Sequence, residues 1–257
     1  MRVGVLKEIK VHEYRVGLTP EAAREYVAAG HEVLIETGAG AGMGALDADY
    51  VAVGAKIAAS AAEIFARAQM IVKVKEPQPS EWVQLREGQI LFTYLHLAPD
   101  RRQAEGLMAS GCTAIAYETV LGPHGGLPLL APMSEVAGRL SIEAAGSALQ
   151  RQNGGRGILL GGVPGVTPAR VVVLGGGVVG THAARMAVGL GAEVSVLDRS
   201  LPRLRELDTL FQGRVRTRYA STAVIETEVF AADAVIGAVL IPGASAPKLV
   251  TKPMLKQ

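Results

Sequence analysis

The 257-residue chain has little that could cross-link it, anchor it in a membrane or bind it to nucleic acid. Cys112 is its one cysteine, which excludes an internal disulfide framework and a cysteine-based zinc site and fits a reducing compartment. The apolar runs are short and broken by glycine, and residues 1–8 lack the apolar core of a signal peptide. The net charge is +2, and the sequence contains no basic block long enough to suggest binding to nucleic acid. We therefore expect a cytoplasmic protein with no membrane or nucleic-acid partner.

What the chain does have is enough apolar material for a sizeable core, with 49% hydrophobic residues and a mean hydropathy of +0.27. Strand patterns alternate with helix patterns, which predicts an α/β fold with parallel sheets covered by helices on both faces. In the first half, strands are expected at residues 3–6, 31–36, 71–74, 90–95 and 114–117. We place two domains at residues 1–130 and 131–257, each with its own parallel sheet.

Several helix starts are marked by residues that favour the N-cap position. Thr19, Asp47 and Ser60 are expected to cap three helices of the first half, and Ser134 a long helix that runs to residue 152. Residues 154–168 are rich in glycine and proline and are expected to form a hairpin or linker over the core. Two other interpretations stay open: a phosphate loop, although no Lys-Ser or Lys-Thr helix follows, and an apolar contact surface between subunits.

The second half is organised around Gly175-x-Gly177-x-x-Gly180, which follows an apolar strand and precedes an alanine-rich helix. That order is typical of a dinucleotide-binding fingerprint. Gly175 permits the tight turn, Gly177 leaves room for a pyrophosphate, and Gly180 lets the helix pack close to the strand. The helix N-terminus offers N–H groups to phosphates, and Asp198, which ends the next strand, is placed to accept hydrogen bonds from ribose hydroxyls. The plainer alternative is an ordinary glycine-rich turn with a solvated Asp198.

The strands expected at residues 171–174, 193–197, 214–217 and 233–240 give this half a sheet in the spatial order 3-2-1-4. A dinucleotide domain of six strands needs two more. Only residues 244–257 follow, so the sequence predicts a Rossmann domain that lacks its last strands.

Polar side chains in the first half follow the expected strands, where open α/β sheets build their sites. They are Arg15, Lys75, His96 and Glu118. An arginine holds a carboxylate by two parallel hydrogen bonds, a lysine acts as a point charge, and a histidine titrates near neutrality. Each also has a plainer interpretation, as a solvated charge or a structural donor. No metal is expected, because the remaining histidines lack metal-ligand spacing. They are His12, His31, His124 and His182.

Blocks spread over essentially the whole chain resemble the alanine dehydrogenase family. They are Arg-Val-Gly-Val-Leu-Lys-Glu at 2–8, Tyr-Arg-Val-Gly-Leu-Thr-Pro at 14–20, Val-Lys-Val-Lys-Glu-Pro at 72–77, Tyr-Leu-His-Leu-Ala at 94–98, Leu-Leu-Ala-Pro-Met-Ser-Glu-Val-Ala-Gly-Arg at 129–139 and Gly-Gly-Val-Pro-Gly-Val at 161–166. The NAD-binding subunit of proton-pumping transhydrogenase is a relative with the same start and fold. The Met-Ser-Glu-Val-Ala-Gly block at 133–138 is similar to the dehydrogenase rather than to the transhydrogenase.

The resemblance implies the reversible, NAD-dependent oxidative deamination of L-alanine to pyruvate and ammonia by a homohexamer. It implies that Arg15 and Lys75 bind the substrate carboxylate and carbonyl oxygen, with Lys75 and His96 catalytic and His96 the acid/base. Tyr94 and Met133 would line the substrate pocket. The implied cofactor contacts beside the fingerprint glycines are Ser134, Val178, Asp198, Arg203, Val239 and Leu240. Relatives can carry a serine that touches adenosine where this chain has Ala220, with Ser221 beside it.

The family also carries an aspartate near the nicotinamide, an asparagine and a C-terminal helix in segments that would follow residue 257. Residues 1–257 alone are therefore expected not to oxidise alanine at a measurable rate. The alternative function is a non-catalytic NAD-binding module, such as a transhydrogenase subunit, or a fragment.

Overall fold

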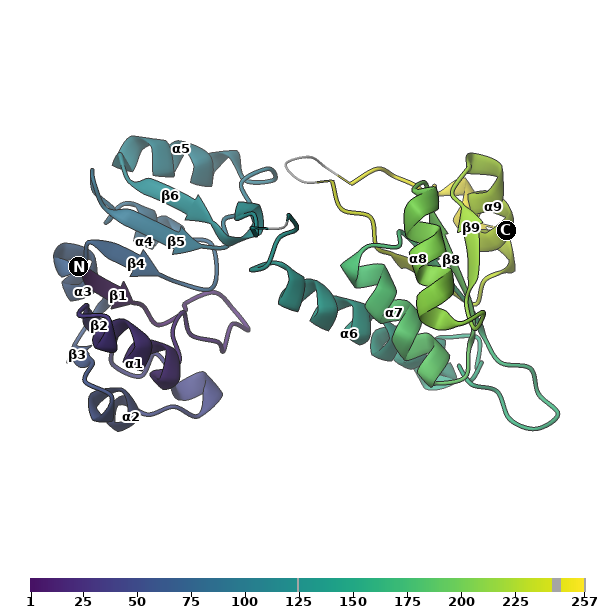
Figure 1. Cartoon of the computed structure of the whole chain (residues 1–257), viewed down its shortest axis with the longest axis horizontal. Coiled ribbons are helices and arrows are strands. Elements are labelled where there is room, and N and C mark those ends of the chain that lie inside the picture. Colours follow the sequence, from purple (N-terminus) through teal and green to yellow (C-terminus); the bar gives the residue numbers. More distant parts are fainter. Residues whose placement is uncertain (124, 242–245, 257) are drawn as a thin grey trace. The chain divides into compact units, whose positions relative to one another are not determined.

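The structure, a computed structural model, describes residues 1–123, 125–241 and 246–256, so that His124 lies outside the described residues. The chain forms two compact units, Met1–Leu129 and Leu130–Gln257 (Figure 1). Each unit is a parallel β-sheet with helices on both faces, which confirms the predicted fold class.

The first unit contains a six-stranded sheet in the order β3-β2-β1-β4-β5-β6, in which all neighbours are parallel. The strands are β1 (Arg2–Val5), β2 (Glu32–Glu36), β3 (Lys56–Ala58), β4 (Met70–Val72), β5 (Ile90–Thr93) and β6 (Thr113–Ala116). β3 was not predicted, because a strand of three residues that begins with lysine gives too short an apolar run. The order reverses between β1 and β4, the kind of switch point at which open α/β sheets bind ligands.

Helices cover both faces of this sheet because alternate residues of its strands are buried on either side. On one face lie α1 (Pro20–Ala28) and α2 (Asp47–Ala52). On the other face lie α3 (Ala61–Arg67), α4 (Pro79–Trp82) and α5 (Arg101–Ser110). The short 3-10 helices η1 (Ala41–Met43) and η2 (Tyr117–Thr119) follow β2 and β6.

Two of the predicted N-caps are confirmed. The Thr19 hydroxyl accepts a hydrogen bond from the backbone N–H of Ala22 at 3.3 Å, and Pro20 begins α1. The Ser60 hydroxyl accepts one from the N–H of Glu63 at 3.4 Å, at the start of α3. These hydroxyls satisfy N–H groups that have no partner inside the helix.

The other two predicted N-caps are wrong. Asp47 is the first residue of α2, and its carboxylate accepts instead from the N–H of Gly38 at 2.8 Å, which holds the turn after β2. Ser134 lies inside α6 (Ala131–Leu149), where its N–H donates to the Leu130 carbonyl at 3.0 Å. Pro132 sits in the first turn of α6, where its fixed φ favours a helix that starts before the serine.

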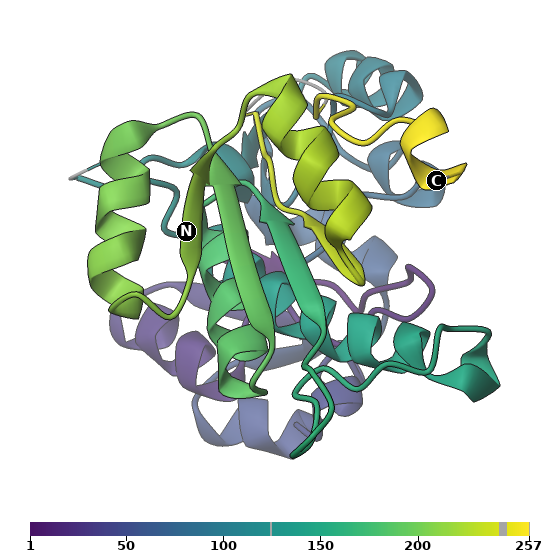
Figure 2. The ribbon, with the colours of Figure 1, turned by 90° about the vertical axis from the view of Figure 1, so that its right-hand side faces the viewer.

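The second unit contains a four-stranded parallel sheet in the order β10-β7-β8-β9. Its strands are β7 (Arg170–Leu174), β8 (Glu193–Asp198), β9 (Arg216–Tyr219) and β10 (Ala234–Gly237). In chain order, read from the β9 edge, this is the predicted 3-2-1-4. The helices α6, α7 (Val178–Gly189) and α8 (Leu201–Phe211) pack on one face and α9 (Thr222–Ala231) on the other (Figure 2).

Short segments complete the second unit. The 3-10 helix η3 (Arg151–Asn153) follows α6, and η4 (Pro253–Lys256) lies near the end of the chain. Between α6 and β7, Val163 and Val166 form an isolated antiparallel bridge, as in the hairpin expected for this region.

Two glycines of the fingerprint have the conformation and packing that the sequence predicts. Gly175 has a φ of +105°, a region that favours glycine, directly after β7. A Cβ atom on Gly180 would lie 1.8 Å from the Gly175 carbonyl oxygen, so α7 and the end of β7 touch through their backbones. Gly189, at the other end of α7, has no atom within 4 Å of an added Cβ.

This contrast predicts opposite effects of two alanine substitutions in α7. Gly180→Ala should lower the free energy of unfolding by at least about 2 kcal/mol, because backbone must move to admit the methyl group. Gly189→Ala should leave the stability within about 0.5 kcal/mol or raise it, because it removes only backbone freedom. Urea unfolding followed by circular dichroism measures both, and equal destabilisation by the two variants would contradict the packing described.

Candidate functional site

The candidate substrate residues lie in loops that leave one edge of the first sheet. Because all its strands are parallel, the loops after β1, β4, β5 and β6 start at the same edge. They carry Arg15, Lys75, His96 and Glu118 respectively. The structure therefore brings the four sequence-predicted groups to the carboxyl edge of one sheet.

Arg15 is held by Glu13 from the same loop. The Arg15 Nε and Nη2 atoms donate to the two carboxylate oxygens of Glu13 at 2.8 and 2.7 Å, and the Arg15 N–H donates at 3.0 Å. The Glu13 side chain is only 6% exposed. The hydrogen bond from Arg15, helped by the charge of Lys75, lowers the pKa of Glu13 to about 2, and Glu13 in turn raises the pKa of Arg15.

Lys75 is fixed through its backbone rather than its side chain. Its N–H donates to Glu8 Oε1 at 3.3 Å, and its carbonyl accepts from Thr93 Oγ1 at 2.9 Å. The side chain is half-buried and makes no hydrogen bond or ion pair with another residue that the structure describes. A half-buried ammonium of this kind is suited to an anionic or carbonyl oxygen of a ligand.

His96 is presented by an unusual backbone turn. Its φ is +48°, in the left-handed region that favours glycine, and its side chain is 47% exposed. The imidazole stacks on the ring of Tyr94, with centroids 5.8 Å apart and planes inclined by 6°. The Tyr94 hydroxyl donates to the Leu129 carbonyl, and burial raises the pKa of Tyr94. His96 is therefore accessible to a ligand while its ring orientation is restricted.

Glu118 supports this turn from the neighbouring loop. One carboxylate oxygen accepts from the His96 N–H at 2.6 Å, and both accept from the Leu95 N–H at 3.1 and 3.2 Å. The same oxygen lies 3.9 Å from His96 Nδ1. Glu118 thus stabilises the strained backbone of His96 and lies beside its ring.

Glu13 and Tyr117 were missed as site residues. Tyr117 contacts Tyr94 edge-to-face with centroids 5.0 Å apart, and burial raises its pKa. The signal for Glu13 was available, because an acid two residues before a loop arginine can pair with it. Tyr117 adjoins Glu118 in the sequence, but nothing in the pattern indicated that its ring supports Tyr94.

The fingerprint turn of the second unit leaves open space at Gly177. Gly177 is the N-cap residue of α7, and nothing lies within 4 Å of a Cβ atom added to it. The Gly176 N–H donates to Asp198 Oδ2 at 2.7 Å, and the Ser200 N–H donates to Asp198 Oδ1 at 2.8 Å. The exposed backbone at Gly177 and the helix N-terminus fit a pyrophosphate, and Asp198 lies at the adjoining strand end.

Arg203 holds this turn rather than projecting away from it. Its Nε donates to the Gly176 carbonyl at 2.7 Å, and its Nη2 donates to the Thr181 hydroxyl at 2.7 Å. It also forms an ion pair with Glu206. A direct cofactor contact of Arg203, as implied by the resemblance, stays a prediction.

The other cofactor residues implied by the resemblance lie at helix starts or strand ends of the second unit. Val178 begins α7 and is 42% exposed, and Val239 and Leu240 follow β10. Ser134 lies near the start of α6, next to Met133, which the resemblance assigns to the substrate pocket. Ala220, at the position where relatives can carry a serine that touches adenosine, is buried in the core. The hydroxyl of the neighbouring Ser221 is already used as the N-cap of α9.

Comparison with known proteins identifies the family of the chain. The N-terminal and C-terminal domain models described as "Alanine dehydrogenase/PNT" match residues 4–137 and 141–257. The chain belongs to the alanine dehydrogenase/PNT family. It is 56% identical to the alanine dehydrogenase of Halomonas elongata and 54% identical to that of Mycobacterium tuberculosis, in each case over 99% of this chain and 69% of the relative.

Solved structures separate the two branches of this family. An L-alanine dehydrogenase matches with a TM-score of 0.91 at 56% identity, over 100% of this chain and 71% of the other. A transhydrogenase from Sinorhizobium meliloti matches with a TM-score of 0.80 at 26% identity, over 99% and 74%. The similarity therefore favours the dehydrogenase branch. The protein is a dehydrogenase with a nicotinamide-type cofactor and small-molecule substrates.

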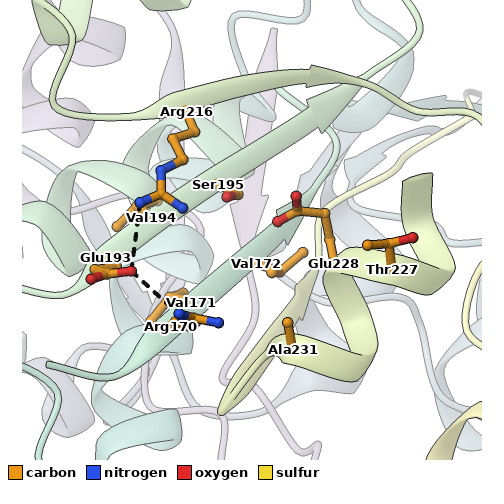
Figure 3. A pocket seen from close by; sticks show the side chains of 10 residues that line it. All are labelled: Arg170, Val171, Val172, Glu193, Val194, Ser195, Arg216, Thr227, Glu228 and Ala231. Atoms are coloured by element: carbon orange, nitrogen blue, oxygen red, sulfur yellow. Dashed lines mark ion pairs between the residues drawn. The ribbon is translucent and has the colours of Figure 1, made fainter. Parts of the chain in front are cut away.

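The second sheet also has a cavity of about 100 Å³ (Figure 3). It lies at the amino ends of the strands, whereas the glycine turn lies at their carboxyl ends. Glu193 lies between Arg170 and Arg216, 3.6 and 3.7 Å from their side-chain nitrogens. Ser195 also lines it, and Glu228 of α9 is paired with Arg218. This cavity is too small for a dinucleotide, and its charges are already paired.

Two further findings concern the described residues alone. They contain no group of three or more His, Cys, Asp or Glu side chains able to hold a metal ion. None of their helices combines the length and apolar character needed to cross a membrane.

The Glu13–Arg15 pair predicts a pH-dependent contribution to stability. Because the pKa of Glu13 is depressed from 4.5 to about 2 in the folded protein, its contribution is present above pH 4.5 and is lost as the pH falls toward 2. Glu13→Gln should therefore destabilise the protein near neutral pH, and the difference from wild type should shrink on acidification. Urea midpoints across this range measure the effect, with Glu25→Gln on the exposed face of α1 as the control. A difference that stays constant with pH would contradict the assignment.

Proposed function

We propose that this protein catalyses the reversible, NAD-dependent oxidative deamination of L-alanine to pyruvate and ammonia. The observation that carries the proposal is the Lys75 ammonium, half-buried and without a side-chain partner among the described residues, at the sheet edge that also carries Arg15 and His96. The names of the relatives at 56% and 54% identity support the same reaction. A transhydrogenase-type module is not favoured, because the transhydrogenase structure is only 26% identical.

The side chains of the first unit have complementary roles in this reaction. Arg15 and Lys75 bind the substrate carboxylate and carbonyl oxygen, and so orient Cα. Tyr94 lines the substrate pocket and stacks on His96. His96 removes and returns protons as water adds to the imine carbon and ammonia leaves, a task suited to an imidazole, which can both accept and donate a proton. Met133 is proposed as a further pocket residue.

The residues of the second unit fit a bound dinucleotide. Gly175, Gly177 and Gly180 form the turn that receives the pyrophosphate at the start of α7, and Asp198 accepts from the ribose hydroxyls. NAD, when bound here, would supply the nicotinamide ring that takes up the hydride released from Cα of alanine. We propose that further contacts come from helix starts, the Arg203 anchor and the turn after β10. These residues are Ser134, Val178, Arg203, Val239 and Leu240.

The same proposal assigns residues 1–130 to the substrate domain and 131–257 to the NAD-binding domain. We propose a homo-oligomer, a hexamer by family resemblance, and the cytoplasm as its compartment. Exposed apolar side chains at Leu159, Val163 and Val166 support subunit contacts at the hairpin before β7. A single cysteine, Cys112, supports a reducing compartment.

Loss of the proposed acid/base should lower turnover sharply. His96→Ala in the complete protein is expected to reduce kcat by about 10²-fold or more, the usual scale for a general acid/base. Lys75→Ala should also lose activity, through substrate placement. His31→Ala, outside the candidate site, serves as the control. Near-full turnover of His96→Ala at its own pH optimum would assign His96 a purely structural role.

Asp198 predicts a preference for NAD over NADP. A carboxylate at the ribose accepts from a 2′-hydroxyl and repels a 2′-phosphate, whereas the neighbouring Arg199 could hold that phosphate. Values of kcat/KM with both cofactors should favour NAD by at least about tenfold, and Arg199→Ala should preserve or increase the preference. A tenfold preference for NADP would overturn the cofactor assignment.

A further inference from the structure

Three charged side chains outside the proposed mechanism form a buried network beside Lys75. Lys73 is completely buried, and its ammonium lies 3.1 Å from Glu8 Oε2 and 2.7 Å from Glu81 Oε1. The side chains of Glu8 and Glu81 are 2% and 5% exposed. Lys73 directly follows β4, and Glu8 lies in the loop after β1, so the network spans the switch point of the sheet.

Stability alone is a poor explanation for this network. Burying an ion pair costs desolvation free energy that the attraction between the charges often only offsets. Burial raises the pKa of Glu8, opposed by the charge of Lys73 and by two backbone N–H groups. A packed apolar group would fill the same space without this cost, so the network calls for a role that depends on its geometry.

The geometry is specific to the segment that carries Lys75. Glu8 Oε1 accepts from the Val74 N–H at 2.6 Å and from the Lys75 N–H at 3.3 Å. These N–H groups lie beyond the end of β4, where the backbone hydrogen bonds between β4 and β1 have ended. Glu8 Oε1 therefore accepts the hydrogen bonds that a neighbouring strand would otherwise accept, while Oε2 pairs with the buried ammonium of Lys73.

We propose that Glu8 is a positioning residue that fixes the backbone of residues 73–75, so that Lys73 is buried and the ammonium of Lys75 reaches the substrate. Lys73 supplies the counter-charge for Glu8. The charge of Lys75 contributes to the lowered pKa of Glu13, the residue that holds Arg15. The inference rests on the proposed function, in which Lys75 binds substrate.

A double-mutant cycle on the complete protein tests this role. Glu8→Gln should lower kcat/KM for pyruvate by about tenfold to a hundredfold, the scale expected when a substrate-binding group is displaced. In a Lys75→Ala background the same change should have less than about a twofold effect, because the group that Glu8 positions is gone. An equal loss in both backgrounds would overturn the proposal.

Glu81→Gln is the matched control, since Glu81 contacts the same ammonium at similar burial but not the backbone of Val74 or Lys75. It should keep kcat/KM within about twofold of wild type even where urea unfolding reports destabilisation. A loss equal to that of Glu8→Gln would show that the buried charge, rather than the positioning, matters.

Glu8→Asp keeps the charge with a shorter reach and covers the case in which Glu8→Gln does not fold. It should show a smaller loss than Glu8→Gln, again absent in the Lys75→Ala background, and a loss that persists in that background would contradict positioning. Full activity of Lys75→Ala alone would instead refute the proposed function. The failure of the inference is thereby distinguishable from the failure of the function on which it rests.

Discussion

Parallel pairing of the strands is the constraint on which the sites of this protein depend. Every strand pair in both sheets is parallel. Parallel strands need crossover helices, and these return the chain to the same edge before each new strand. The loops after the strands therefore gather at one edge of each sheet. In the first unit that edge carries Arg15, Lys75 and His96, and in the second it carries the glycine turn and Asp198.

The same kind of hydrogen bond fixes three of these loops at the point where the backbone pairing between strands ends. A carboxylate at the end of one strand, or in the segment after it, accepts backbone N–H groups of the loop beside it. Glu8 does so for the segment after β4, Glu118 for the turn after β5, and Asp198 for the turn after β7. Backbone donors beyond a strand end need acceptors if they are shielded from water, and charged acceptors form the stronger bonds. The loops of the candidate sites are thus stabilised by acids, and of these only Asp198 is also proposed to contact a ligand.

The sequence was sufficient for the features that depend on local pattern. Alternating elements predicted two parallel sheets, and the glycine fingerprint predicted the strand order 3-2-1-4 and the close packing at Gly180. Ser134 was misjudged as a cap, because a good capping residue inside a helix looks the same in sequence as one at its start. Lys73, in a strand pattern, and Glu8, in the loop after a strand, were missed as partners because charged residues are normally read as exposed. Their burial follows from contacts between distant segments, which a local pattern does not encode.

The central claim is that the carboxyl edges of the two sheets bind the substrate and the dinucleotide. A crystal structure of the complete protein with pyruvate and reduced NAD tests it most directly. The account predicts the pyruvate carboxylate and carbonyl within hydrogen-bond distance of Arg15 and Lys75, with His96 beside them. It also predicts the pyrophosphate against Gly177 at the start of α7. Pyruvate bound away from Arg15 and Lys75, or a dinucleotide at the amino end of the second sheet near Glu193, would contradict the account.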